Sequence, residues 1–202
     1  MIVRRLILAG LAALGSTAVH AAPGPPGERP PLVPAREASV LYRLTRSGAP
    51  PLEVRVTIRA GGSPLRVDMA DRNYLLVDEA ARTMTMVVPD EEMALVLPFD
   101  SDAVGQFRLN TRMRFTRRAA DTVATVRCTN WEVALGQTRG SVCVSDDGIL
   151  LRSAGQDEAG RRTLMEAVSV SYTPAPATEF DAPPAYGRMV AGPNGAVPAP
   201  RP

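Results

Sequence analysis

The chain has 202 residues, 45% of them hydrophobic and only 4% aromatic, and all of its basic residues are arginines. Its 23 basic and 21 acidic residues give a formal charge of +2, and the arginines are spread along the chain, which argues against nucleic-acid binding. The single histidine, His20, lies in a predicted signal peptide. The remaining chain therefore lacks the residue needed for Ser-His-Asp or Cys-His catalysis and the commonest transition-metal ligand. We therefore expect that the protein is not an enzyme and that it has neither a cofactor nor a metal site.

The first 21 residues have the pattern of a cleavable signal peptide. Arg4 and Arg5 form a short positive region, an apolar run follows over residues 6–19, and Ala21 precedes the predicted cleavage site. The run is shorter than the roughly 20 residues that a membrane-spanning helix needs, and no later segment is apolar enough to span a membrane. We expect a periplasmic protein. The arginine pair leaves both general secretory and twin-arginine export open.

Two segments rich in proline and glycine flank one predicted domain. Residues 22–36 and 190–202 are expected to be a disordered leader and a disordered tail, because such composition does not support a packed core. The domain is placed at residues 37–189. That length is enough for one hydrophobic core.

The sequence of the domain predicts a succession of short strands. Residues 52–59 alternate strictly between apolar and polar side chains, the pattern of a strand with one buried face. Strands separated by turn residues are predicted at 65–69, 74–78, 83–88, 93–97, 122–135, 141–145, 149–153 and 162–172, with a hairpin around 117–121 and a short helix within 100–111. The predicted fold class is mostly β (α+β): a curved antiparallel sheet or half-barrel with one or two short covering helices.

Cys128 and Cys143 are the only cysteines, and they are expected to form a disulfide in an oxidising compartment. A redox-active pair usually occurs as Cys-x-x-Cys at a helix start, and this chain has no such motif. Trp131, three residues after Cys128, either lines a ligand site or packs beside the disulfide as a structural residue.

Methionines are numerous for a chain with so few aromatic residues. Met84, Met86 and Met93 are the predicted ligand-binding residues together with Trp131, because flexible thioethers suit irregular apolar ligands. The alternative is that these methionines fill the core of the sheet. The acidic stretches at 90–92 and 146–147 fall where turns are expected and supply too few ligands for calcium.

Three segments carry a family resemblance. They are Cys-Thr-Asn-Trp-Glu at 128–132, Ser-Val-Cys-Val-Ser-Asp-Asp-Gly-Ile-Leu-Leu-Arg at 141–152, and 180–189 with its Pro-Pro-Ala-Tyr-Gly-Arg-Met ending. They resemble a family of uncharacterised bacterial periplasmic domains, which is similar in turn to the LolA, LolB and LppX carriers of lipoproteins and lipids. The resemblance implies an antiparallel half-barrel whose hollow face, under a helical lid, holds acyl chains.

Two functions are therefore expected. The first is a non-enzymatic periplasmic carrier or binding protein for a lipid, an acylated protein or another apolar ligand. The second is an envelope interaction or sensor domain without a ligand, which binds a partner protein through the same sheet. A side-chain-filled interior favours the second.

Overall fold

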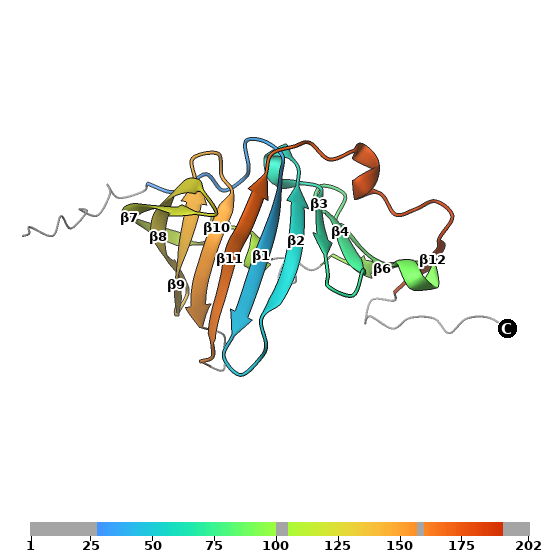
Figure 1. Ribbon diagram of the computed structural model, residues 1–202, viewed down its shortest axis with the longest axis horizontal. Coiled ribbons are helices and arrows are strands. Elements are labelled where there is room, and N and C mark those ends of the chain that lie inside the picture. Colours follow the sequence, from blue (N-terminus) through green and yellow to red (C-terminus); the bar gives the residue numbers. More distant parts are fainter. Residues whose placement is uncertain (1–27, 100–104, 157–159, 192–202) are drawn as a thin grey trace, which may run out of the picture.

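The computed structural model describes residues 28–99, 105–156 and 160–191 (Figure 1). The signal peptide lies outside these residues. The described residues contain twelve strands: β1 (Ala38–Arg46), β2 (Leu52–Ile58), β3 (Leu65–Asp68), β4 (Tyr74–Asp78), β5 (Thr83–Val88), β6 (Met93–Pro98), β7 (Arg114–Val123), β8 (Val126–Leu135), β9 (Thr138–Ser145), β10 (Leu150–Gln156), β11 (Arg162–Ser171) and β12 (Gly187–Val190). The described helical segments are 3₁₀ turns at Ala60–Gly62, Pro89–Glu91, Gly105–Phe107 and Ala177–Phe180.

All strands form one curved sheet in the order β12-β6-β5-β4-β3-β2-β1-β11-β10-β9-β8-β7. Neighbours along the chain pair as antiparallel hairpins over β1–β6 and over β7–β11, and the pairing of β1 with β11 joins the two runs. The predicted class of a mostly β, curved sheet is confirmed. One pair, β6 with β12, is parallel, because the chain crosses from β11 to the far edge before β12 begins.

The structure differs from the predicted elements in the middle of the chain. The reversal expected around residues 117–121 occurs at Ala124 and Thr125, both with positive φ, where no glycine or asparagine marks the turn. The predicted strand at 122–135 is consequently divided between β7 and β8. Of the predicted helix at 100–111, residues 100–104 lie outside the described residues, 105–107 form a single 3₁₀ turn, and 108–111 are not helical. β1 and β12 were not predicted.

The two faces of the sheet differ in what covers them. We call the inner face the one that bears Tyr42, Val54 and Val56 on β1 and β2, and the outer face the opposite one. Between β6 and β7, Phe99, Phe107 and Leu109 pack against the core of the inner face. The segment between β11 and β12 arches over part of the outer face, where Tyr186 and Ala182 pack against Tyr74 and its buried neighbours (Figure 1).

The leader and the tail are partly attached to the domain. Residues 28–36, within the predicted leader, form no helix or strand and bend at 32–33 and 35–36, and the Pro34 carbonyl accepts a hydrogen bond from Gly61. Ala191 in the predicted tail is buried, and its N–H donates to Val96. Both segments therefore begin to interact with the sheet closer to the termini than the composition predicted.

Candidate functional site

The inner face has a closed half, where side chains fill the space. Phe107 packs against Tyr42 with ring centroids 6.1 Å apart, and Leu109 joins the same core. The Tyr42 hydroxyl donates to the Leu150 carbonyl at 2.6 Å, and burial raises the pKa of Tyr42. Only about 30 Å³ of empty space remains between these side chains and the sheet. This half is a packed core.

The leader seals the end of this closed half. Glu28 forms an ion pair with Arg117 at 2.7 Å, and Ala35 donates to the Asp147 carbonyl at 2.8 Å. Val33 passes so close to Gly148 that a Cβ there would collide with the Val33 carbonyl oxygen, and Gly148 has a φ of +85°. A glycine is therefore needed where the leader crosses the turn between β9 and β10.

The other half of the inner face, the open half, contains two adjoining hollows of about 280 and 190 Å³. Ser153 and Thr163 line both. Their further apolar walls come from β1, β2, β8, β9, β11 and the segment before β7: Leu44, Leu52, Leu109, Met113, Val133, Leu135, Val142 and Met165. The combined space falls in the range of small-molecule sites, which is about 300–1,000 Å³.

Two facing glycines keep the second hollow open. Gly140 on β9 pairs with Gly155 on β10, so the floor carries no side chains at this level. A Cβ at Gly140 would lie 2.6 Å from the Ala154 carbonyl oxygen, so this position accepts only glycine. A Cβ at Gly155 would have its nearest neighbour at 3.7 Å, which is ordinary contact. The hollow can therefore be filled by substitution at Gly155 without a backbone clash.

The predicted ligand-binding residues lie elsewhere on the sheet. Met84, Met86 and Met93 share the inner face of β5 and β6 by register, whereas Trp131 is on β8, far along the sheet order. Met84 is 4% exposed and belongs to the core, while Met86 and Met93 are half-buried. None of the four lines either hollow. A ligand-binding role for Met86 and Met93 stays a prediction.

Trp131 is 5% exposed and packs edge-on against Phe115, with ring centroids 6.3 Å apart. The Arg117 guanidinium lies 6.0 Å from its ring, and its Nε1 is buried with no hydrogen-bond acceptor among the described residues. Trp131 pairs with Val142, which lines the second hollow. It therefore lies beside the wall of the hollow, on the same face of the sheet.

Sequence reasoning did not identify the residues that do line the hollows. They come from segments far apart in the chain, and single leucines such as Leu44 and Leu52 look like ordinary strand residues. The available signal was the pair of glycines inside strands, Gly140 and Gly155, because glycine within a strand often marks a place where space or close approach is needed.

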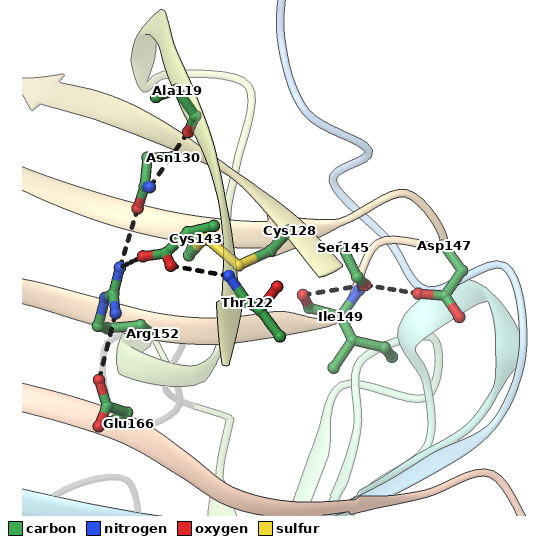
Figure 2. The surroundings of a disulfide bond; sticks show 11 residues. Ala119, Thr122, Cys128, Asn130, Cys143, Ser145, Asp147, Ile149, Arg152 and Glu166 are labelled. Atoms are coloured by element: carbon green, nitrogen blue, oxygen red, sulfur yellow. Dashed lines mark hydrogen bonds and ion pairs between the residues drawn. A yellow bond between two sulfur atoms is a disulfide. The ribbon is translucent and has the colours of Figure 1, made fainter. Parts of the chain in front are cut away.

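Cys128 and Cys143 form a disulfide between β8 and β9, as predicted, with Cα atoms 5.5 Å apart (Figure 2). It lies on the outer face and is nonetheless buried, with the two residues 1% and 0% exposed. Beside it, the Ser145 hydroxyl donates to Asp147 at 2.5 Å and accepts from the Ile149 N–H at 2.9 Å. These bonds fix the turn over which the leader passes.

Replacement of both cysteines by alanine is expected to lower the free energy of unfolding by about 3 kcal/mol, because the disulfide closes a loop with a separation of 15 residues. Alanine avoids burying two new hydroxyl groups. Urea denaturation of both proteins with and without reductant measures the effect. Reductant should lower the stability of the natural protein and leave the stability of the variant unchanged. Equal stability of the natural protein and the variant without reductant would contradict the prediction.

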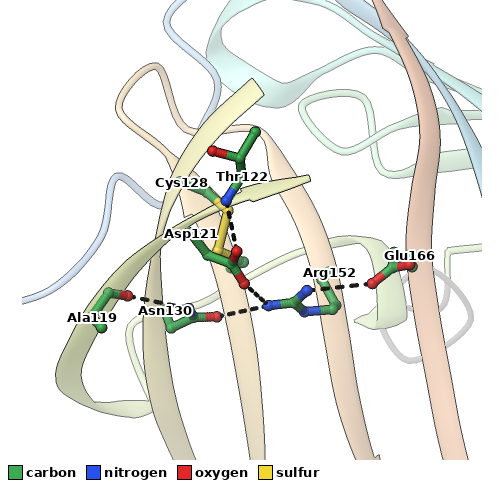
Figure 3. Close-up of polar contacts among 8 residues, drawn as sticks. Ala119, Asp121, Thr122, Cys128, Asn130, Arg152 and Glu166 are labelled. Carbon is green, nitrogen blue, oxygen red and sulfur yellow. Dashed lines mark hydrogen bonds and ion pairs between the residues drawn. A yellow bond between two sulfur atoms is a disulfide. The ribbon is translucent and has the colours of Figure 1, made fainter. Parts of the chain in front are cut away.

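Arg152 on β10 connects three strands near the disulfide (Figure 3). Its guanidinium lies 2.5 Å from Asp121, 3.1 Å from the Asn130 side-chain oxygen and 3.4 Å from Glu166. In a flat sheet β7 would lie three spacings of about 4.8 Å from β10. The contact with Asp121 therefore requires a bend that brings the β7–β8 hairpin over the disulfide, which explains why the cysteines are buried.

The hydrogen bonds of this region lower the pKa values of two carboxyl groups. Arg152, the Thr122 N–H and Asn130 lower the pKa of Asp121. Burial raises the pKa of Asp147, but hydrogen bonds from Ser145 and Arg36 outweigh it and leave the pKa below its ordinary value. Both groups thus stabilise the fold when ionised.

Acidification is expected to destabilise the protein through these groups. Their folded pKa values lie below the ordinary value of about 3.9, so their contribution is complete above that pH and is lost as the pH falls through the folded values. Urea midpoints measured between pH 6 and about pH 3 should fall less steeply for Asp121→Asn than for the natural protein. Asp146→Asn, which removes an exposed carboxylate, is the control and should keep the natural slope.

No protein-family model and no curated protein sequence matches this chain. Among solved structures, an uncharacterised conserved protein from Thermus thermophilus aligns with a TM-score of 0.53 and 11% identity, over 77% of this chain and 91% of the other. Pseudomonas aeruginosa MucB, solved in complex with MucA, aligns with a TM-score of 0.49 and 13% identity, over 75% of this chain and 57% of the other. A LolA superfamily protein from Nitrosomonas europaea aligns with a TM-score of 0.39 and 9% identity, over 75% of this chain and 92% of the other.

The structural neighbours thus include a LolA superfamily protein. The Thermus protein is the one of these three with a TM-score above 0.5, and at 11% identity it shows the fold alone. Within the described residues, no group of three or more histidine, cysteine or acidic side chains is arranged to hold a metal ion. No helix in that part of the chain has the length and apolarity to cross a membrane.

Proposed function

We propose that this protein is a periplasmic binding or carrier protein that holds the acyl chain of a lipid or lipoprotein in the open half of the inner face. The observation that carries the proposal is the pair of adjoining apolar hollows next to a fully packed closed half. An acyl chain is flexible and apolar, and it suits an elongated site whose walls are leucine, valine and methionine side chains. Ser153 and Thr163 are polar residues that line both hollows, and Arg46, Arg108 and Arg139 are charged residues of the lining.

The buried disulfide supports a location outside the cytoplasm, since disulfides persist in oxidising compartments. The predicted signal peptide would deliver the chain there. The absence of histidine from residues 22–202 makes a purely binding role the simpler one.

The test is native mass spectrometry with lipid extraction on protein purified from the periplasm of its own host. We expect a reproducible added mass that extraction identifies as an acyl compound. A clean unliganded mass at native abundance, together with failure to bind fatty acids or lysolipids added in solution, would overturn the proposal.

The packed closed half favours the second candidate, a domain that binds a partner protein without a small ligand. Its interior is filled by Phe107 and Leu109, as expected for a sheet that presents its surface to another protein. Cross-linking in the periplasm followed by mass spectrometry distinguishes the two, because a single stoichiometric protein partner with no acyl compound supports this candidate alone.

A further inference from the structure

Exposed arginines collect at the end of the sheet where the hollows open. The pairing register places Arg114 on β7 opposite Ala134, which in turn lies opposite Arg139 on β9. Arg162 begins β11, and Arg46 at the end of β1 lies opposite Thr163 in the wall of both hollows. Arg112 precedes β7 at the same end. We call Arg46, Arg112, Arg114, Arg139 and Arg162 the open-end arginines.

These arginines are not used for internal ion pairs. All five are exposed, and none takes part in any of the salt bridges found among the described residues. Arg139 acts at longer range, since it adds to the effect of Arg118 in lowering the pKa of Glu132. The β10–β11 connection also contains Asp157 and Glu158, which lie outside the described residues. Glu53, next to Leu52 in the wall of the first hollow, is paired with Arg43, so the five open-end arginines leave the described residues around the hollows with a net positive charge.

Large apolar side chains are exposed at the same end. Leu52, the first residue of β2, is 46% exposed; Leu135, the last residue of β8, is 39% exposed; and Leu164, near the start of β11, is 37% exposed. They are three of the six exposed large apolar residues in the described part of the chain. Leu52 and Leu135 also line the hollows. Apolar tips among arginines are the combination that binds a lipid interface.

We propose that the open end docks on an anionic phospholipid surface, with the open-end arginines on the headgroups and the exposed leucines at the boundary with the acyl chains. This inference rests on the proposed function, because the docked hollows would receive an acyl chain directly from the bilayer. The positive charge of the open-end arginines complements the negative charge of an anionic phospholipid surface. The exposed leucines favour such a surface over an acidic protein, because a protein surface has no apolar layer beneath its charges.

The test measures partitioning onto vesicles by flotation. The natural protein should float with vesicles of equal parts phosphatidylglycerol and phosphatidylcholine. With vesicles of phosphatidylcholine alone it should remain unbound at the bottom of the gradient. Raising the salt from about 0.1 M to about 1 M shortens the screening length from about 10 to about 3 Å and should release it. One arginine near an anionic surface changes partitioning about fivefold, so loss of three should weaken it on the order of 100-fold.

The variant replaces three open-end arginines that line neither hollow: Arg112→Gln, Arg114→Gln and Arg162→Gln. The matched control removes the same charge from exposed arginines elsewhere that make no recorded ion pair: Arg29→Gln, Arg55→Gln and Arg127→Gln. The control should float like the natural protein. Equal partitioning of the two variants would overturn the inference, as would binding to an acidic peptide with no flotation on any vesicle.

A second readout separates this inference from the proposed function. Capture of a neutral pyrene-labelled fatty alcohol in solution reports on the hollows and does not depend on membrane docking. The triple open-end variant should retain capture while it loses flotation. If the natural protein floats but never captures the probe, the carrier function is wrong and the docking surface stands; if it captures the probe but never floats, the docking surface is wrong.

Discussion

Gly155→Leu is expected to weaken the binding of an acyl chain about 50-fold while leaving the protein folded. The new side chain projects into the second hollow from a floor that has no side chains at Gly140 and Gly155. It would take the place of about three methylene groups of the ligand, each worth about 0.8 kcal/mol of burial. No backbone atom obstructs it, because the nearest neighbour of a Cβ at this position is 3.7 Å away.

Titration with a dansyl-labelled fatty acid measures this effect. Gln156→Leu is the matched control, because it adds a leucine to the other neighbour of Gly155 on the same strand, which is exposed on the opposite face and lines neither hollow. The control should bind like the natural protein. If Gly155→Leu binds the fatty acid with unchanged affinity and an unchanged circular dichroism spectrum, the acyl chain does not occupy the second hollow.

Met84→Asp is expected to lower the free energy of unfolding by about 3–5 kcal/mol, whereas Met86→Asp, on the same strand and face, is expected to cost about 1 kcal/mol. Met84 is 4% exposed and packs within the core, so an aspartate there would place a charged group in an apolar environment. Met86 is half-buried, and water can reach a carboxylate at that position. The comparison distinguishes the two interpretations of the methionines.

Urea denaturation gives the two stabilities, and fatty-acid titration of Met86→Asp gives its effect on binding. Met84→Leu conserves volume and should cost less than about 1.5 kcal/mol, which makes it the control for loss of the thioether alone. A loss of binding by folded Met86→Asp would support the predicted role of Met86 in a ligand site. Equal stability of Met84→Asp and Met84→Leu would show that Met84 is not a core residue.

The sequence determined the local structure where alternation and turn chemistry agree. The strands at Tyr74–Asp78 and Thr83–Val88 were predicted at their observed limits, because turn residues mark their ends. The disulfide between Cys128 and Cys143 followed from composition, since two cysteines in an exported chain have one possible intramolecular pairing. Met84 and Met86 share a face because of the two-residue period of a strand, and the observed pairing of Val88 with Met93 brings a third methionine to that face.

Local signals failed where the decisive contacts are distant in the chain. The turn at Ala124 and Thr125 has positive φ without glycine or asparagine, and the pairing with β8 and the bonds of Asp121 hold it in place. The 3₁₀ turn at Gly105–Phe107 stands where a longer helix was predicted, because Phe107 and Leu109 must both reach the core of the inner face.

The site itself was decided by tertiary structure. Leu44, Gly155 and Met165 become neighbours only when β11 pairs with β10 and also with β1, and the pairing of β1 with β11 spans more than half of the chain. The same pairings bring arginines from four separate segments to one end of the sheet. A sequence fixes the face of a strand on which each side chain lies, because that depends on a period of two residues. Which strands lie next to one another, and where space is left between them, depends on the packing of the whole sheet.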